Sequence, residues 1–565
     1  MFNSLIKQKS NKLFIYFLIG WTLICLIQNY YTDASGEEAY YWLFSQHLDW
    51  GYLDHPPVTA FILKPGYWLL HNNLGLRLGI LVLNILTIIV LRKTLSIQND
   101  KLFIWVMLGL LPVHLGSLLV KTDVPLIFFT AWFFFLYKNY LQKDKPVTVF
   151  LLALSIALLI LSKYHGVLVV FFTLCSNIRL LGKKSFWAVA GLSLLFLLPH
   201  FYWQYTHDFA SVRFHLYNRE DLGFKWMNVV KYILMQPVVF GPLIGVMLFA
   251  ASAFHKTISA FHRALKFNIL GVLLFFLISA FTVEIHKHWT SVLMVPLILL
   301  GYEYMIEREN WKKVMRYVAI ASLVIIIPFR LILAFDFLPQ SLSKKMEVLH
   351  HWDTWAEEIK GLSHGLPVMF IDGYEQASRY SYLSGTEVHC YNTFDYRETQ
   401  HDLWPLEDSL QGKTVFVVNR NDGNPVYKQY TTLIGNKIFY RVIENFRSFR
   451  KVTVSMTGGE IIAKPGEQIT VNISIVNKYN YPVDFSSVED RKVFLNAHFL
   501  VGLNQKLNEQ IQILTDTIVS NSHVSKTVEF KVPSVPGKYD LRFSIQVEGI
   551  EAPINSHKYK VKVKE

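Results

Sequence analysis

The polar segment between residues 33 and 57 interrupts an otherwise apolar N-terminal half and carries the residue types that acid–base chemistry needs. It contains the adjacent carboxylates Glu37 and Glu38, with Asp33 shortly before them. Ionisable groups next to membrane-spanning segments are energetically costly, and this indicates a function. Neighbouring carboxylates in a poorly hydrated cleft take different protonation states, so one can act as a general base. We expect one of these three to do so.

The run Asp54-His55-Pro56-Pro57 is the second candidate element. Consecutive prolines lack backbone donors and fix their φ angles, so they hold the preceding side chains rigidly. Aspartate and histidine are competent metal ligands, and a divalent metal held by Asp54 and His55 is therefore one interpretation. The other is that this segment re-enters the membrane and that a proline begins a helix.

Further charged residues stand at the ends of apolar segments. Asp123 precedes Pro125 at the expected start of a helix, where capping and the helix dipole favour a carboxylate even without a catalytic role. The cationic groups come in three pairs, which are Lys163 with His165, Arg213 with His215, and Lys287 with His288. A single lysine can simply extend to the membrane surface, whereas several cations near carboxylates make a site for an anion such as phosphate.

The elements that must position these groups are membrane helices. Of 565 residues, 52% are hydrophobic and 17% are charged, whereas soluble domains carry about 25% charged residues. Apolar segments of roughly 17–25 residues can cross a bilayer. We expect about eleven of them, near residues 13–30, 74–91, 102–119, 124–141, 147–162, 165–181, 186–203, 229–253, 267–283, 289–306 and 317–335.

Basic residues predict how these segments are oriented. Clusters occur after alternate segments, beginning with Lys7, Lys9 and Lys12 before the first one, and such clusters face the cytoplasm. The N-terminus is therefore expected inside and, for an odd number of spans, the region after residue 338 outside. The net charge of +13 is then mainly a topology signal. Because the basic residues are scattered over short loops, nucleic-acid binding is not expected.

Three domains are predicted: a transmembrane domain over 1–338, a small exterior α/β domain over 339–450 and an exterior immunoglobulin-like β-sandwich over 451–565. Apolar strands near 367–371, 386–391 and 413–418 flank a helix near 374–383, a pattern typical of α/β domains. From 452 onward almost every segment alternates like a strand, with turns at Pro465-Gly466 and Pro536-Gly537. We expect the sandwich to be a structural or partner-binding appendage.

Several of these pieces together form an ordered set of motifs. They are Glu37-Glu38-Ala-Tyr40-Tyr41, Asp54-His55-Pro56-Pro57, Thr122-Asp123-Val-Pro125, Leu161-Ser-Lys163-Tyr164, the segment from Pro199 through His207 to Arg213, and His288-Trp289. In this order they resemble the superfamily of dolichyl-phosphate-mannose protein mannosyltransferases and lipid A aminoarabinose transferases, which are polytopic glycosyltransferases of the GT-C type. The resemblance covers residues 30–335.

The resemblance implies a bacterial enzyme of the cytoplasmic membrane that moves a sugar, at the outer face, from a polyprenyl-phosphate donor to a lipid A, glycan or protein acceptor. It implies Glu37 as general base, with Glu38, Asp33 and Asp123 as further catalytic candidates. The expected ligands of the donor phosphate are His55, Lys163, Tyr164, Arg213 and His288. The residues expected to position the acceptor or the loop are Tyr41, Asp54 and His207. The family usually has Asp-Glu where this chain has Glu37-Glu38, so the acid is one methylene longer or is displaced to Asp33.

Two other classes stay open. One is a polytopic transporter or sensor of an anionic ligand with the β-sandwich as a binding module, and the other is a non-catalytic relative whose sandwich recruits a partner. Transporters often carry internal repeats and ionisable groups near mid-span. The sequence has no clear repeat and gathers its charges at one membrane face, which favours the enzyme.

Overall fold

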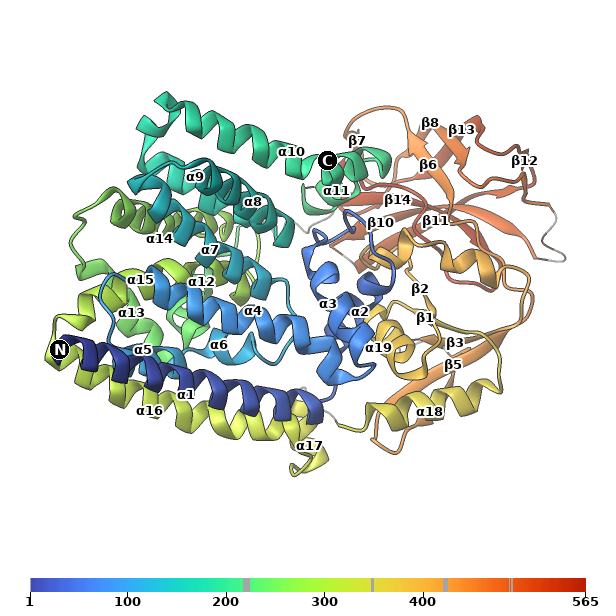
Figure 1. Ribbon diagram of the computed structural model, residues 1–565. Coiled ribbons are helices and arrows are strands. Elements are labelled where there is room, and N and C mark those ends of the chain that lie inside the picture. The colour runs from blue at the N-terminus through green and yellow to red at the C-terminus, as the bar shows by residue number, and fades with distance from the viewer. Residues whose placement is uncertain are drawn as a thin grey trace. The chain divides into compact units, whose positions relative to one another are not determined.

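The structure, a computed structural model, describes residues 2–216, 224–346, 350–419, 425–486, 488, 491–502 and 504–565. The chain divides into two compact units, one formed by residues 1–211 and 221–350 and the other by residues 212–220 and 351–565. Figure 1 shows the first unit as a bundle of helices and the second as strands with a few helices. This is the polytopic helical architecture with a strand-rich C-terminal region that the sequence predicts.

The helical unit contains long helices joined by short connections. Its elements are α1 (Phe2–Tyr31), α2 (Gly36–Gln46), α3 (Val58–Leu69), α4 (Asn73–Thr94), α5 (Asp100–Gly109), α6 (Leu111–Leu115), α7 (Asp123–Gln142), α8 (Pro146–Ser162), α9 (Gly166–Ser176), η1 (Ile178–Gly182), α10 (Lys184–Thr206), α11 (Ala210–Leu216), α12 (Trp226–Phe240), α13 (Pro242–Phe254), α14 (Ala260–Ser279), η2 (Lys287–Leu293), α15 (Met294–Ile306), α16 (Glu309–Ala334) and α17 (Gln340–Lys345). The chain passes from the first unit to the second within α11, after Ser211.

Many of the expected spans are single helices. Within the described residues, seven helical segments are long and apolar enough to cross a membrane: Lys12–Tyr31, Asn73–Thr94, Asp123–Gln142, Lys184–Thr206, Ala260–Ser279, Lys287–Ile306 and Glu309–Ala334. Helices α8 and α9 are apolar but shorter, and they occupy two further expected segments. The chain is therefore a polytopic helical membrane protein, and the total of eleven spans stays a prediction.

Two expected segments are broken. The segment 229–253 forms α12 and α13, which meet at an angle of 97° because Gly241 takes a φ of 116° and Pro242 starts the second helix. The segment 102–119 forms α5 and the short α6, because Leu110 is extended and Pro112 stands at the beginning of the second helix. A proline fits the first turn of a helix but cannot continue one.

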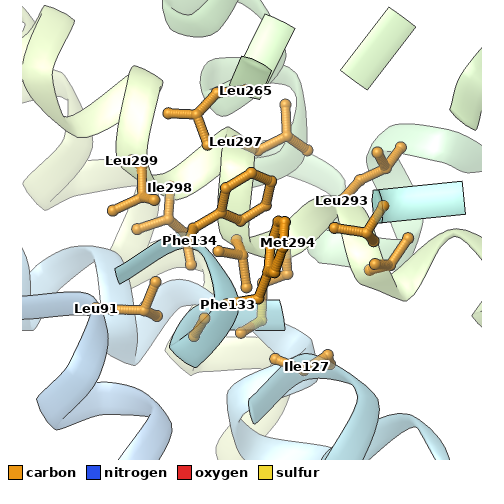
Figure 2. Packing of buried hydrophobic residues seen from close by; sticks show 14 of the residues in the cluster. Leu91, Ile127, Phe133, Phe134, Leu265, Leu293, Met294, Leu297, Ile298 and Leu299 are labelled. Carbon is orange, nitrogen blue, oxygen red and sulfur yellow. The ribbon is translucent and has the colours of Figure 1, made fainter. Parts of the chain in front are cut away.

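The helices pack through large apolar side chains. Phe133 and Phe134 of α7 lie between Leu91 of α4, Leu265 of α14 and the α15 side chains around Leu297 (Figure 2). Lipid tails are as apolar as these side chains, so close van der Waals packing, rather than removal from water, favours helix association in a membrane.

The α3–α4 hairpin depends on glycines. A Cβ atom on Gly75 would lie 1.7 Å from the backbone oxygen of Leu70, and one on Gly79 would lie 2.3 Å from that of Ile62. The two helices therefore approach each other more closely than any side chain would allow. Arg77 lies between these glycines on α4, so the close approach of the two helices fixes the backbone position from which its side chain extends.

The second unit contains two β structures. The first is a sheet in the order β2-β1-β3-β5-β4, in which β1 runs parallel to β2 and β3. Its elements are α18 (Trp352–Ser363), β1 (Val368–Ile371), α19 (Tyr374–Ser384), β2 (His389–Tyr391), η3 (Gln400–Asp402), η4 (Pro405–Leu410), β3 (Val415–Asn419), β4 (Lys428–Thr431) and β5 (Lys437–Ile443). The three expected strands and the expected helix near 374–383 are confirmed.

The second β structure is a sandwich. A sheet in the order β11-β10-β14-β15-β7 packs on a sheet in the order β13-β8-β6, and Phe530 of β13 contacts Phe499 and Phe543 across the interface. The strands are β6 (Val452–Met456), β7 (Ile461–Ala463), β8 (Gln468–Asn477), β9 (Val483–Asp484), β10 (Val493–Val501), β11 (Asn504–Leu514), β12 (Thr517–Ile518), β13 (His523–Lys531), β14 (Gly537–Val547) and β15 (Tyr559–Val563). The domain boundary near 450 stays a prediction, because one cluster of buried apolar residues extends from Met369 to Val563.

Candidate active site

Helix α2 places the two adjacent glutamates in its first turn. The Ser35 hydroxyl accepts the backbone N–H of Glu38, and the Glu38 carboxylate accepts the backbone N–H of Ser35, which completes a capping box. Carboxylates in the first turn also interact favourably with the helix dipole. The local sequence therefore fixes where α2 begins and where both glutamates stand.

The Glu38 carboxylate is buried in an ion pair with Arg77. Arg77 Nε donates to Glu38 Oε1 at 2.7 Å and Nη2 donates to Oε2 at 2.8 Å, and the side chains are 0% and 1% exposed, respectively. The backbone N–H of Val120 also donates to Oε1 at 3.0 Å. Burial acts to raise the pKa of Glu38, but the charge and hydrogen bonds of Arg77, with the backbone donors, outweigh burial and hold the pKa below its usual range.

Arg77 joins α4 to the end of α1 as well. Its guanidinium donates to the backbone oxygens of Thr32 at 2.6 Å, Asp33 at 2.9 Å and Asn29 at 3.3 Å. Arginine provides five donors in a rigid fork, and this site engages them with one carboxylate and three carbonyls. The pair therefore holds three segments together, and donors engage both carboxylate oxygens of Glu38.

Glu37 lies in a different environment, although it is the next residue. Its side chain is 41% exposed. Tyr41 Oη donates to Glu37 Oε1 at 3.2 Å, and the Lys121 ammonium lies 3.6 Å from Oε2. Tyr41 Oη is also 3.1 Å from His55 Nε2, so a tyrosine hydroxyl connects the expected base with an expected phosphate ligand. This carboxylate is accessible, and a cation and a hydroxyl flank it.

The loop that carries His55 is fixed at several points. The Tyr52 ring is buried and stacks on Phe44 at 4.0 Å, and its hydroxyl donates to the Phe44 and His47 backbone oxygens. Ser211 Oγ donates to Tyr52 O at 2.7 Å. A Cβ atom on Gly51 would lie 2.3 Å from the Trp203 ring, so α10 packs directly against this loop.

A second ion pair lies where α7, α8 and η2 meet. Lys163 Nζ donates to Asp123 Oδ1 at 2.9 Å, and Ser291 Oγ donates to the same oxygen at 2.6 Å. Both charged side chains are about nine-tenths buried. The structure therefore brings the expected Asp123 and Lys163 together and shows the lysine engaged with a carboxylate.

Tyr164 belongs to a polar network beside the loop. Its hydroxyl lies 3.2 Å from His200 Nε2 and accepts from Gln204 Nε2 at 3.1 Å, and His200 Nδ1 is 2.7 Å from the backbone oxygen of Trp50. Burial raises the pKa of Tyr164 to about 12, and the nearby charge of Asp54 acts in the same direction. Tyr164 therefore remains a neutral hydroxyl at physiological pH.

The other predicted residues are more scattered. Asp33 is half-buried near Arg77, and His207 stacks on Trp203 at 4.4 Å. His288 stacks on His286 and is the exception, because it lies close enough to Asp123, Lys163 and Lys121 to interact with them electrostatically. Arg213 belongs to the second unit, where Nη1 lies 3.4 Å from His557 Nε2. Among the described residues, Asp54 and His55 do not gather with a third metal-binding side chain. The roles expected for these residues stay predictions.

Two residues that contact the expected carboxylates, Arg77 and Lys121, were not among the predicted site residues. Arg77 is an arginine close to the start of an apolar span, and an ionisable residue at such a depth is itself a signal. Lys121 belongs to the polar corner before Asp123, but its partner Glu37 is distant in sequence. The segment from Val120 to Asp123 therefore contacts Glu38 through its first residue, Glu37 through its second and Lys163 through its last.

Comparison with solved structures gives the fold. ArnT from Cupriavidus metallidurans superposes in its apo state with a TM-score of 0.56 at 12% identity, over 76% of this chain and 98% of that chain. The same protein bound to undecaprenyl phosphate gives 0.51 at 12% identity, over 75% and 97%. The chain is thus a polytopic membrane protein with the GT-C fold.

The sequence matches agree with this fold. Residues 54–203 match the family model of dolichyl-phosphate-mannose-protein mannosyltransferases. The lipid A galacturonosyltransferase RgtD of Rhizobium johnstonii is 27% identical over 242 residues, which are 40% of this chain and 51% of that protein. The matched region spans about half the length of this curated relative. The chain is thus similar to protein mannosyltransferases and to a lipid A galacturonosyltransferase, in line with the resemblance of its ordered motifs.

Proposed function

We propose that this protein is a membrane glycosyltransferase that moves a sugar from a polyprenyl-phosphate donor to a lipid acceptor, with Glu37 as the general base. The observation that carries the proposal is the contrast between adjacent glutamates on α2. Arg77 and backbone donors engage both oxygens of Glu38, whereas Glu37 is 41% exposed and lies beside Lys121, Tyr41 and, through Tyr41, His55.

The proposed reaction is a direct displacement at the anomeric carbon. An acceptor oxygen attacks that carbon, its proton passes to a Glu37 carboxylate oxygen, and the bond from the carbon to the donor phosphate oxygen breaks. The lipid phosphate leaves with the electron pair, so the anomeric configuration inverts. A positioned general base contributes about 10²–10⁴-fold to such a step.

The cations near Glu37 are suited to stabilise the leaving phosphate. The Lys121 ammonium contacts the Glu37 carboxylate, and the His55 ring contacts the Tyr41 hydroxyl. Preorganised cations and donors stabilise charge that develops in a transition state. Lys163 and Asp123 neutralise each other, so we assign this pair to holding α7 and α8 in place, and we give the phosphate to Lys121 and His55.

The relatives support the choice of substrates. RgtD is named as a lipid A galacturonosyltransferase, and ArnT has a structure bound to undecaprenyl phosphate. We therefore propose an undecaprenyl-type donor and a lipid A-type acceptor. The basic clusters of the sequence favour placing Glu37 at the outer face of the cytoplasmic membrane, with the N-terminus inside and the second unit outside.

The test compares Glu37→Gln with wild type and with Lys163→Arg. Membranes that contain each protein are supplied with polyprenyl-phosphate-linked sugars, and mass spectrometry of the lipids measures the transferred mass. Glu37→Gln should lower transfer by about 10²–10⁴-fold while the protein still inserts and purifies as wild type does. Lys163→Arg keeps the buried charge and should keep measurable transfer. Wild-type activity in Glu37→Gln would eliminate this base.

A further inference from the structure

A second cluster of ionisable side chains lies away from the proposed active site. His255 follows the end of α13, His262 lies in the first turn of α14, and Glu303 lies in the last turn of α15. Ser291, which binds Asp123, stands near the beginning of the 20-residue span Lys287–Ile306, and Glu303 stands near its end. Twelve residues separate Ser291 from Glu303, a helical rise of about 18 Å, so the cluster lies well apart from the Asp123 pair.

The three side chains converge on one point. Glu303 Oε2 lies 2.9 Å from His262 Nε2 and 3.6 Å from His255 Nε2. One ligand atom from each residue can be chosen so that all of them lie within 4.8 Å of one another. The two imidazole rings are 4.7 Å apart and nearly perpendicular, at 77°. This is the spacing of ligand atoms around a single ion rather than that of a stacked pair.

Local structure holds each side chain in place. Ser259 Oγ accepts the backbone N–H of His262 at 3.1 Å and thereby caps α14. The backbone N–H of His255 donates to Ala251 O at 3.1 Å, which keeps it on the last turn of α13. Ser252 Oγ donates to Leu297 O at 3.1 Å and ties α13 to α15. These three neighbouring helices of the bundle (Figure 1) preorganise the cluster.

The histidines have hydrogen-bonding capacity that the protein does not use. Both residues are buried, at 9% exposure, and among the described residues the Nδ1 atoms of both lack a hydrogen-bond partner. Buried polar atoms are nearly always satisfied, and an unsatisfied one points to a water or an ion. Each ring thus has one nitrogen at Glu303 and another in need of a partner.

The surrounding charge does not exclude a cation. Lys138 is close enough to interact electrostatically with Glu303, but its ammonium donates to Thr94 O at 2.7 Å and to Ser96 Oγ at 2.9 Å. The Glu303 carboxylate instead contacts the two imidazoles. Two imidazoles and one carboxylate form a common three-residue donor set for Zn²⁺, with a fourth position for water.

We propose that His255, His262 and Glu303 bind a divalent transition metal, with Zn²⁺ as the fitting ion. The metal would join the end of α13, the beginning of α14 and the end of α15. It would close the short connection between α13 and α14 and hold these helix ends together. The metal would lie apart from the sugar transfer proposed at Glu37.

The test measures metal binding to the purified full-length protein in detergent. After chelator treatment, Zn²⁺ is titrated in competition with a fluorescent chelator, and bound zinc is counted by elemental mass spectrometry. The variants are His255→Gln with His262→Gln, and separately Glu303→Gln. The chain has 20 histidines, so the matched control replaces two exposed ones, His71→Gln with His523→Gln.

Wild type and the control should each bind one tight equivalent of Zn²⁺, which also raises their Tm. The double histidine variant should lose that equivalent and the rise in Tm. Glu303→Gln should bind at least about tenfold more weakly. Co²⁺ in the wild type should give the absorption of a tetrahedral N/O site. If the double variant cannot be purified, the zinc affinity of the near-isosteric Glu303→Gln variant alone tests the proposal. Equal affinity of that variant and wild type, or no tight equivalent in wild type, would overturn the proposal.

Discussion

Removing the guanidinium of Arg77 should destabilise the helical unit more than most single substitutions. Arg77→Met keeps the apolar stem but leaves the Glu38 carboxylate buried without its cation. It also removes the donors at 2.6, 2.9 and 3.3 Å to the carbonyls of Thr32, Asp33 and Asn29. Removing one partner of a buried pair costs about 3–5 kcal/mol, and each unsatisfied buried group costs about 1–3 kcal/mol. The loss is therefore a large share of a typical stability of about 5–15 kcal/mol.

A second variant tests whether charge or hydrogen bonding dominates. In Glu38→Gln with Arg77→Met no buried charge remains unpaired, so this double variant should be more stable than Arg77→Met alone. It should still be less stable than wild type, because the three carbonyls stay without their donor. Glu37→Gln is the matched control: its partner Lys121 is 37% exposed, and such a pair contributes only about 0–1 kcal/mol.

The assay is thermal unfolding of the detergent-purified full chain, followed by intrinsic fluorescence. A loss of about 3–5 kcal/mol corresponds to a Tm lower by roughly 6–20 °C. The pKa of Glu38 is held below its usual value of 4.5 in the folded state. The ion pair therefore contributes its full stability at pH values above 4.5, and this stability is lost as the pH falls through the folded pKa. The comparison therefore belongs near pH 7. A wild-type Tm for Arg77→Met would refute the framework role of the pair.

Three further outcomes are expected. Gly75→Ala should lower Tm, because its Cβ would lie 1.7 Å from Leu70 O. Gly20→Ala is the control and should leave Tm unchanged, because nothing lies within 4 Å of the Cβ it adds. Equal Tm values for the two variants would contradict the close approach of α3 and α4. Lys163→Met should destabilise the protein because Asp123 loses its buried partner, and adding Asp123→Asn should recover part of the loss, as a double-mutant cycle on Tm would show. Burial raises the pKa of Asp372 to about 6, so this carboxyl binds its proton more tightly in the folded state than in the unfolded state. The free energy of unfolding should therefore fall by about 2–3 kcal/mol as the pH rises from about 4 to about 6. Asp372→Asn should remove that dependence in Tm measured against pH, and an unchanged slope would contradict it.

The fold was largely predictable because its signals are local. Long apolar segments predicted the helices, and alternation predicted strands such as β6 (Val452–Met456), which begins where the alternation starts. The breaks at Gly241-Pro242 and before Pro112 also have local signals, which the length of the apolar segments concealed. Proline and glycine at mid-segment should have lowered the expectation of one continuous helix.

The site was predictable only in part, because its pairings are distant in sequence. The motifs brought Glu37, Glu38, Asp123 and Lys163 into consideration. They could not distinguish the surroundings of the two glutamates, because Arg77, which pairs with Glu38, lies on another helix. Nor could they indicate that Lys163 is paired with Asp123. Adjacent residues on a helix point about 100° apart, so neighbours in sequence enter different surroundings.

The segment from Val120 to Asp123 connects the buried Glu38–Arg77 pair directly to the proposed general base Glu37. Val120 is attached to Glu38, Lys121 to Glu37 and Asp123 to Lys163. A shift of α7 by even one residue would break all three attachments together, so this corner tolerates changes of side chain far better than changes of length. A residue inserted here would separate these contacts, and the distance between Lys121 and Glu37 would change first.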